Sequence, residues 1–526
     1  MNQPLLATLV KRDDSGLRLG AAMWIGISAV ARWTRKGIVE HVYELLSFLL
    51  PFVIYARSVS SEPASWDTAE LQAVPYLLGI AHPTGFPFYT LLGWAYSHIF
   101  IFGTVAYRLN IFSSFWVATA CYGGYLVSRE LNVPKFIALL AALWFGVGSI
   151  VWTHASRAEV HDLALALSVG AILYGIKFLR TCAIKYYFAT TLFFGLALAT
   201  HPIAIWLIPG LLVLYFLAHR KPSFRELSIS LGIIVVCLSL YLYLPIRSAY
   251  VMGHHGDPTA RLIGTTGSIL LNYNDPSTWS GFIKEISGSQ FHVSGAVWAA
   301  WNPSQIQNYL WQWLTSLNTE YGAFGIILAF LGLQRLWRYN RRFTTVLVLL
   351  GTMAIPFSYA FAAVEGDPDR YRLLSFWLIP ILMSGASISL GAEKAWARKA
   401  IVATLMLLWG AQTFYNNQGI FNNRNNMGGR ALISEAVKRI PQGSIVVTTW
   451  LDAASLAYGA YVDGSFPDRT VISAQPGQYA RMYPQWLREA PIYVIAPPGN
   501  AALGIGLKSL GLLDGSHVLY QVLQRS

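Results

Sequence analysis

Charged residues are scarce in this chain of 526 residues: they make up 12% of it, whereas hydrophobic residues make up 55%. A soluble protein of this length needs more charge to cover its surface, so the composition excludes an ordinary soluble globular protein. Cysteine is scarce as well. Cys121, Cys182 and Cys237 lie in or beside apolar segments, and their spacing matches neither a disulfide framework nor a metal site.

Long apolar runs, by contrast, recur along most of the chain. Runs of about 20 residues can each cross a hydrocarbon core of roughly 30 Å, so they predict a mainly α-helical, polytopic transmembrane bundle of about eleven spans. The expected spans are 38–56, 108–128, 136–153, 162–180, 186–200, 202–218, 227–245, 321–337, 343–362, 371–391 and 399–415.

The net charge of +13 would suggest a nucleic-acid partner in a soluble protein. Here the basic residues cluster in short loops between apolar runs, which indicates membrane topology and no nucleic acid. The transmembrane domain then covers 38–415, preceded by a basic cytoplasmic or interfacial segment, 1–37. The loops 57–107 and 246–320 and the C-terminus lie outside the cytoplasm. We expect an integral protein of a bacterial inner membrane, with its site facing the periplasm.

The character of the sequence changes after the last apolar run. An asparagine- and glycine-rich stretch, 416–430, predicts a linker, and alternating strand-like and helix-like segments predict a small extracytoplasmic α/β domain over 431–526. The expected strands and helices in that domain are 444–450 (strand), 453–461 (helix), 478–489 (helix, broken at Pro484) and 492–496 (strand).

The first outer loop holds two carboxylates, Asp67 and Glu70, three positions apart. If the loop is helical there, both lie on one face and raise each other's pKa, which would leave one poised as a general base. The other interpretation is a helix start, at which the helix dipole favours an acidic residue such as Asp67. The membrane-surface position favours function, because acids at such depths are functional by default.

Two turns on the outer side carry further candidates. The turn 82–87 has two prolines and a glycine, which aim His82 at a phosphate or sugar, or else cap a helix. The turn 153–162 offers Glu159 and His161 beside the membrane. Its spacing matches no standard zinc pattern, so the polar wall of a substrate cavity is favoured over a metal site.

Three arginines at outer span ends, Arg247, Arg370 and Arg372, could bind a lipid-linked phosphate bidentately. The alternative is snorkelling to the interface, which explains many arginines at span ends. Arg370 and Arg372 are the more suggestive pair, because the positive-inside rule disfavours basic residues on that side. No residue is assigned to a metal, and a divalent ion is neither demanded nor excluded.

These residues also carry a resemblance to a known family. The stretches 67–70 (DTAE) and 78–89 (LGIAHPTGFPFY) resemble the signature Asp-x-Gly-Glu … Leu-Gly-Val-Ala-His-Pro-Pro-Gly-Tyr-Pro-Leu-Tyr. That signature belongs to a bacterial multispanning family, long labelled a domain of unknown function, in the glycosyltransferase-C (GT-C) superfamily. Its animal relatives are transmembrane protein O-mannosyltransferases. Further matching stretches are 108–110, 158–161, 241–247 and 274–276.

Three positions depart from the family pattern: Ala69 replaces a glycine, Thr84 replaces the second proline and His161 replaces a tyrosine. The resemblance implies a GT-C-like architecture whose outer first loop bears a catalytic acid. It also implies a polyprenyl-phosphate sugar donor and inversion at the anomeric carbon. By that analogy Asp67 is the general base, with Glu70 as its partner or as an acceptor contact.

The sequence is therefore interpreted as a membrane glycosyltransferase. It would move a sugar such as mannose from a polyprenyl-phosphate donor to a hydroxyl of an extracytoplasmic protein or glycan. The main alternative, a transporter or flippase of lipid-linked sugars, should show inverted repeats or paired broken helices. A non-catalytic scaffold with the same fold is the other alternative. The candidates for binding the donor phosphate or sugar are His82, Glu159, His161, Arg247, Arg370 and Arg372.

Overall fold

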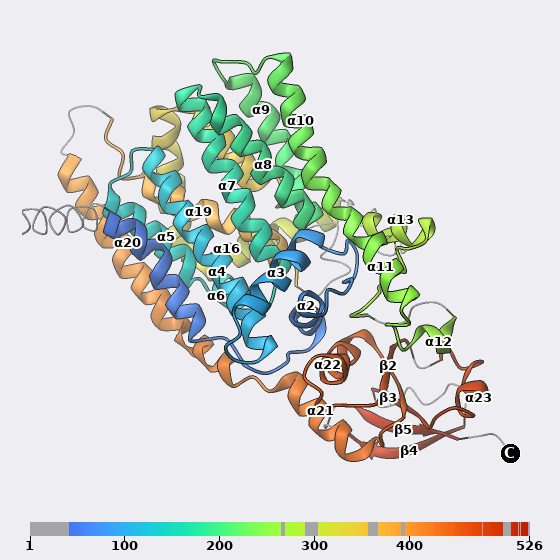
Figure 1. The fold of residues 1–526 in the computed structure, drawn as a ribbon. Helices are drawn as coiled ribbons and strands as arrows, with labels where there is room; N and C mark the ends of the chain where they lie inside the picture. The colour runs from blue at the N-terminus through green and yellow to red at the C-terminus, as the bar shows by residue number, and fades with distance from the viewer. Residues whose placement is uncertain are drawn as a thin grey trace, which may run out of the picture.

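The computed structural model describes residues 41–264, 269–289, 303–355, 367–390, 395–475, 477–497, 506–513, 515 and 517–523. They form a large helical body and a small sheet domain at one end of it (Figure 1). The expected class, mainly α with a small C-terminal α/β part, is confirmed. The predicted N-terminal segment 1–37 lies outside the described residues.

The helical body is built from helices that follow one another along the chain. It begins with His41–Ala56. The next elements are α2 (Trp66–Leu77), α3 (Pro87–Ile99), α4 (Val105–Glu130), α5 (Lys135–Val147), α6 (Ser149–Ala155), α7 (Val160–Thr181) and α8 (Ile184–Thr200). There follow η1 (Pro202–Leu207), α9 (Ile208–Leu217), α10 (Phe224–Leu238), α11 (Tyr243–Gly253), α12 (Ala260–Ile263) and α13 (Trp279–Ser287). The last are α16 (Pro303–Tyr339), α17 (Arg341–Thr352), η3 (Pro368–Arg372), α19 (Leu373–Gly385) and α20 (Ala395–Asn417).

The core of the body lies between α4, α5, α7, α16 and α19, where α7 packs against α4 and α8, and α16 packs against α19. Large aromatic side chains fill it, and a buried indole N–H needs an acceptor there. Trp377 donates to the carbonyl oxygen of Ala120 at 3.0 Å, and Trp152 donates to the Ser58 hydroxyl at 2.8 Å. These bonds fix the helices against one another around an otherwise apolar interior.

Three described helices are long and apolar enough to cross a membrane: Val160–Thr181, Phe224–Gly253 and Ile306–Tyr339. The pair α5 and α6 passes the same test together but is bent by 71°. Residues on α10 such as Leu231 and Val236 expose 63% and 69% of their surface, as a lipid-facing helix does. The chain is an integral membrane protein, and the expected count of about eleven spans stays a prediction.

The first loop, which was predicted to be outer, is not irregular, since it folds into α2 and α3 (Figure 1). Asp67 lies in the first turn of α2, and Pro87 begins α3, where its missing N–H costs nothing. The two helices pack against each other and against α4. The two carboxylates of the sequence prediction are therefore held on a rigid element that opens this loop.

The C-terminal domain is a five-stranded sheet with the strand order β2-β1-β3-β5-β4. The central strands β1 (Ile445–Thr448) and β3 (Ile492–Ala496) were expected; β2 (Thr470–Ser473), β4 (Leu507–Leu512) and β5 (Val518–Val522) were not. Helix α22 (Trp450–Tyr461) starts sooner than predicted. In place of the expected helix 478–489 there is the short helix α23 (Tyr483–Trp486), with Pro484 in its first turn.

The stretch 416–430 forms helical turns, although a linker was expected there. Helix α20 runs to Asn417, η4 spans Gln418–Asn425 and α21 spans Gly428–Arg439. The Asn417 amide donates to the carbonyl oxygen of Val147 at 2.9 Å, and the Ser60 hydroxyl donates to that of Asn426 at 2.9 Å. Polar asparagines therefore serve here as hydrogen-bond partners of the helical body, which fixes the C-terminal domain in place.

Candidate active site

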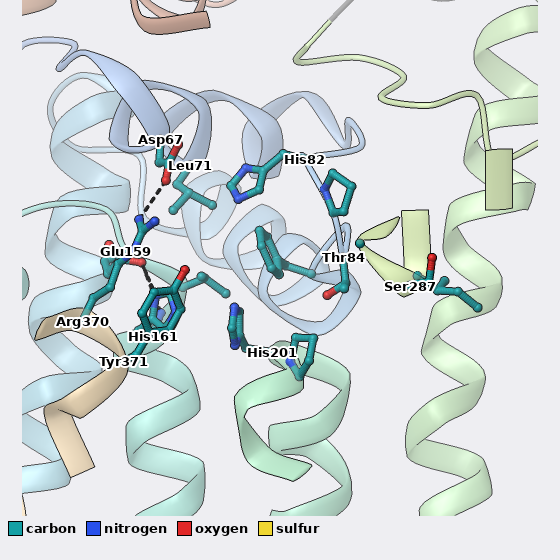
Figure 2. A pocket seen from close by; sticks show the side chains of 16 residues that line it. Asp67, Leu71, His82, Thr84, Glu159, His161, His201, Ser287, Arg370 and Tyr371 are labelled. Atoms are coloured by element: carbon teal, nitrogen blue, oxygen red, sulfur yellow. Dashed lines mark hydrogen bonds and ion pairs between the residues drawn. The ribbon is translucent and has the colours of Figure 1, made fainter. Parts of the chain in front are cut away.

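A cavity of about 150 Å³ lies where the start of α2, the turn 82–87, the start of α7 and η3 meet (Figure 2). Five of the eight predicted site residues line it. Those five are Asp67, His82, Glu159, His161 and Arg370. The remaining lining residues are Leu71, Pro83, Thr84, Phe86, Val160, His201, Pro202, Ile286, Ser287, Gly288 and Tyr371.

Asp67 is held by both of its oxygens at the edge of this cavity. Its Oδ2 accepts a hydrogen bond from Arg370 Nη1 at 2.8 Å, and its Oδ1 accepts one from the indole N–H of Trp450 at 3.2 Å. Burial opposes ionisation, but the charges of His82 and Arg370 outweigh it and hold the pKa of Asp67 below its ordinary value. Asp67 is therefore a carboxylate at neutral pH and can accept a proton.

The lowered pKa of Asp67 gives the stability of the fold a pH dependence of known sign. Ionised Asp67 stabilises the folded state above its ordinary pKa of 3.8, and this contribution is lost as the pH falls through the lower folded-state value. We expect the difference in thermal midpoint between wild type and Asp67→Asn to stay constant from about pH 8 to pH 5 and to shrink below about pH 4. Thermal unfolding in detergent measures it; a difference that grows on acidification would contradict the assignment.

Glu70 is completely buried and lines neither this cavity nor the second one described below. Its Oε1 accepts the backbone N–H of His82 at 2.7 Å, and its Oε2 accepts Nδ1–H of the His82 ring. Burial raises the pKa of Glu70, and the bonds to His82 offset only part of this rise. Burial contributes more to this rise in pKa than repulsion from Asp67 does. The two bonds to His82 make Glu70 the anchor of the turn. Its catalytic role stays a prediction.

Replacement of Glu70 by alanine should therefore destabilise the protein, because it leaves the His82 N–H unpaired and opens a cavity. We expect a loss of about 2 kcal/mol or more in unfolding free energy, seen as a lower apparent midpoint in detergent. Glu435→Ala is the matched control, since Glu435 is partly exposed on α21 and pairs with Lys438. Equal midpoints for the two variants would show that the Glu70–His82 contact does not hold the turn.

Among the described residues, one group of three side chains could hold a cation. Asp67, Glu70 and His82 present ligand atoms that all lie within 4.8 Å of one another. Two carboxylates and an imidazole suit a divalent transition metal, but the present Glu70–His82 bond would have to open. The expectation that no residue is assigned to a metal remains a prediction.

Glu159 and His161 meet at the N-terminus of α7, below Asp67 in Figure 2. His161 Nδ1–H donates to Glu159 Oε1 at 2.7 Å. Burial opposes ionisation of Glu159, but His161 and two nearby arginines lower its pKa well below the ordinary value. The His161 ring stands edge-on to that of Tyr371, with centroids 4.8 Å apart. The histidine that departs from the family pattern thus remains part of the cavity wall.

His201 is a cavity residue that the sequence prediction missed. It lies between α8 and η1, and its ring centroid is 4.3 Å from that of His161. Burial and the neighbouring His161 lower the pKa of His201 well below its ordinary value, so its ring is neutral. Its Nδ1 accepts the N–H of Ile203 at 3.1 Å, which leaves the proton on Nε2 as a donor. The only sequence signal was a His-Pro pair between two apolar runs.

Arg247 and Arg372 are not brought to the cavity. Arg247 donates to the carbonyl oxygens of Leu78 at 2.6 Å and Leu77 at 3.1 Å, where it satisfies the C-terminal end of α2. Arg372 is buried and pairs with Asp369 at 3.1 Å. Both positions fit a structural role, and the predicted phosphate contact of these two arginines stays untested.

A second cavity, of about 280 Å³, adjoins the first one and is lined mainly by polar side chains. Asp67, Glu159 and Arg370 line both cavities, so these three charged residues stand at the boundary between them. The other lining residues are Ser60, Glu62, Ala64, Ser65, Trp66, Thr68, Gln72, Asn110, Thr153, Ser156, Arg157, Asp367, Asn423 and Asn426.

A helical membrane body with a small C-terminal sheet domain is the fold that this chain shares with solved GT-C structures. The chain superposes on the crystal structure of ArnT from Cupriavidus metallidurans in the apo state with a TM-score of 0.51 and 12% identity, over 92% of this chain and 98% of that one. It superposes equally on ArnT bound to undecaprenyl phosphate, with a TM-score of 0.51 and 11% identity, over 91% and 98%. The expected GT-C-like fold is thereby confirmed.

The particular relatives are protein O-mannosyltransferases. Residues 67–223 match the family described as the N-terminal domain of protein O-mannosyl-transferase TMEM260. The Dictyostelium discoideum protein O-mannosyl-transferase tmem260 is 24% identical over 377 residues, 66% of this chain and 44% of that protein. The Mus musculus TMEM260 is 24% identical over 455 residues, 81% and 61%. The chain thus spans less than two thirds of either relative, and the resemblance drawn from the motifs is confirmed.

Proposed function

We propose that this protein is a membrane glycosyltransferase that moves a sugar from a polyprenyl-phosphate carrier to a hydroxyl acceptor, with Asp67 as the general base. The similarity to protein O-mannosyltransferases supports the class of reaction and makes mannose a candidate sugar. The observation that carries the proposal is the boundary position of Asp67, Glu159 and Arg370 between two adjoining cavities. Two substrates can approach this boundary from opposite sides, as a transfer reaction requires.

The first cavity suits the donor. It adjoins a small, mainly apolar crevice along α7, η1 and α19, and both are lined by His161, Arg370 and Tyr371. The crevice offers Leu165, Leu207 and similar side chains to a polyprenyl tail. Arg370 then stands where the phosphate meets the sugar, and a guanidinium matches phosphate oxygens in geometry and charge. The ArnT structure with undecaprenyl phosphate supports a lipid carrier of this type.

The second cavity suits the acceptor, because its wall offers amides, hydroxyls and carboxylates rather than apolar groups. Gln72 and Asn110 are typical of it: the Gln72 amide donates to Asn110 Oδ1 at 3.0 Å. Such a wall can hold a polar hydroxyl-bearing group with directional hydrogen bonds. On the topology predicted from the basic loops, the acceptor is an extracytoplasmic protein or glycan.

The proposed step is a single displacement at the anomeric carbon. The acceptor hydroxyl gives its proton to the Asp67 carboxylate as its oxygen forms a bond to that carbon. The bond between the anomeric carbon and the phosphate oxygen breaks, and the electron pair leaves with the polyprenyl phosphate. Arg370 stabilises the negative charge that grows on the leaving phosphate. Attack from the side opposite the phosphate inverts the configuration at the anomeric carbon.

A polytopic transporter or flippase is the second candidate, because α5 and α6 form an apolar helix pair bent by 71°. Transporters use broken helices of this kind in pairs. Among the described residues one bent pair of this type is found. Glu320 binds its break, with Oε1 accepting the Ser149 hydroxyl at 2.8 Å and the Ile150 N–H at 2.6 Å. This acid satisfies the helix start, which gives the break a structural reason.

One assay separates the two functions. Purified protein in nanodiscs is given a panel of polyprenyl-phosphate sugars, and sugar transfer and donor hydrolysis are measured. The same protein in liposomes is tested for movement of the lipid-linked sugar across the bilayer. Turnover without transport supports the transferase. Transport without turnover on any donor would replace it with the flippase, and neither activity would favour a non-catalytic scaffold.

A further inference from the structure

Trp450 links the C-terminal domain to the candidate base across 383 positions of the sequence. It is the first residue of α22, directly after the turn that ends β1. Its indole N–H donates to Asp67 Oδ1, and its ring stands edge-on to the rings of His82 and Tyr273, with centroids 5.7 and 5.5 Å apart. It lines neither cavity, so its contact is with the base and the turn rather than with a substrate.

The two bonds of the Asp67 carboxylate come from different parts of the chain. Arg370 of the helical body holds Oδ2, and Trp450 of the C-terminal domain holds Oδ1. A carboxylate bonded on both oxygens is restricted in rotation about its last side-chain bond, which keeps one lone pair aimed in a fixed direction. Such fixed geometry matters because a small misplacement of a catalytic group costs a large factor in rate.

The C-terminal domain, together with the start of α21 (Gly428–Arg439) that leads into it, also holds the segment that precedes α2. The Ser455 hydroxyl donates to the carbonyl oxygen of Ala64 at 2.9 Å, and the N–H of Gly429 donates to that of Pro63 at 3.1 Å. Arg430 pairs with Glu62 at 2.7 Å. These contacts grip three consecutive residues that lie only three to five positions before Asp67.

The contact between the two parts has a shared apolar core as well. α2 packs against α22, and one buried cluster joins Ala69 and Leu71 of α2 to Leu432 of α21 and Ala453 of α22. Figure 1 shows α21 and α22 on the side of the sheet domain that faces the helical body. This packing holds the C-terminal domain against the helical body.

We propose that the C-terminal domain is a structural part of the active site, with Trp450 as the positioning residue that holds Asp67 and the 62–64 segment as its seat. This rests on the proposed function and adds the role of a domain that the matched family segment, 67–223, does not include. The domain acts on the base from outside both cavities. Removal of the hydrogen bond from Trp450 should therefore slow the chemical step without weakening the binding of either substrate.

The first test is Trp450→Phe, which removes the N–H donor and keeps an aromatic ring beside His82. Trp486→Phe is the matched control, because the Trp486 indole in the same domain donates to the carbonyl oxygen of Leu262 at 2.8 Å, away from both cavities. We expect kcat to fall about tenfold in Trp450→Phe with both KM values within about twofold of wild type, and no such fall in Trp486→Phe.

The double variant Trp450→Phe/Asp67→Asn distinguishes a positioning role of Trp450 from a purely structural one. If Trp450 acts through Asp67, its replacement costs nothing further in the residual turnover of Asp67→Asn. Additive losses, an equal loss in Trp486→Phe, or a change confined to the acceptor KM would overturn the positioning role. Unchanged kcat in Trp450→Phe would overturn it as well.

The second test moves the domain without touching a side chain of the site. A Cβ atom at Gly429 would lie 2.1 Å from the carbonyl oxygen of Ala64 and 2.6 Å from that of Pro63, so Gly429→Ala must push the domain off its seat. Gly419→Ala is the control, because a Cβ there meets nothing within 4 Å. We expect Gly429→Ala alone to lower both the apparent thermal midpoint and kcat.

The two tests also distinguish this inference from the proposed function. Absence of turnover in wild type with every donor would count against the transferase, and the midpoint comparison of Gly429→Ala with Gly419→Ala would still test the seat. Wild-type turnover together with equal midpoints and equal kcat in the two glycine variants would leave the transferase intact and overturn the role of the domain.

Discussion

Asp67→Asn should lower sugar transfer about a hundredfold or more while the protein stays folded, because it removes the carboxylate proposed to take the acceptor proton. Asparagine keeps the shape of the side chain and an oxygen that can still accept the bond from Arg370. The loss should therefore appear in kcat rather than in either KM. Initial rates with saturating donor and acceptor, in nanodiscs, measure it.

The control for this change is Asp468→Asn, which alters an exposed aspartate of the C-terminal domain and should leave the rate unchanged. Turnover of Asp67→Asn equal to wild type would keep the enzyme and move the base. Glu159 would be the next residue to test, because it also stands at the boundary of both cavities. Glu70, which is buried behind His82, would follow it.

Arg370→Gln should have the second large effect. Arg370 pairs with Asp67 at 2.8 Å and is 8% exposed, and its loss removes both the partner of the base and the cation proposed for the leaving phosphate. We expect kcat to fall about a hundredfold to a thousandfold, as for removal of one donor to a developing anion. Removal of one partner of a buried ion pair also costs about 3–5 kcal/mol of stability, so midpoints are measured alongside rates.

Two matched variants separate charge from position. Arg370→Lys keeps a positive charge without the planar fork and should recover part of the rate. Arg372 lies two residues further along η3 and lines neither cavity. Its replacement by glutamine should therefore leave the donor KM unchanged. A raised donor KM in Arg372→Gln would support the sequence prediction that this arginine binds the phosphate. Full activity of folded Arg370→Gln would exclude Arg370 from the reaction.

The sequence predicted only in part which candidate residues come together at the cavity. The sequence pointed to Asp67, His82, Glu159 and His161 because they stand in turns, predicted to be outer, beside apolar runs. Arg247 and Arg372 share that pattern, yet the fold uses them at the end of α2 and beside Asp369. A span-end arginine can satisfy a helix terminus or a ligand, and only its neighbours decide between the two.

The pairing of the two carboxylates shows the same limit. Their spacing correctly places Asp67 and Glu70 on one helix, but the prediction of mutual repulsion missed the partners that dominate. His82 and Arg370 lower the pKa of Asp67, and Arg370 comes from more than 300 positions away, whereas burial raises the pKa of Glu70. His201 escaped notice because a lone histidine between apolar runs has no distinguishing spacing.

The sequence by itself determined the class of the molecule: long apolar runs require helices in a membrane, and the motifs of the first outer loop indicate the GT-C relationship. Both depend on order along the chain, which a sequence displays directly. Only the tertiary structure decided that Trp450 and Arg370 close on Asp67 and that two cavities meet there. Those contacts join distant segments, and packing of whole helices and domains fixes their geometry rather than any local preference of the chain.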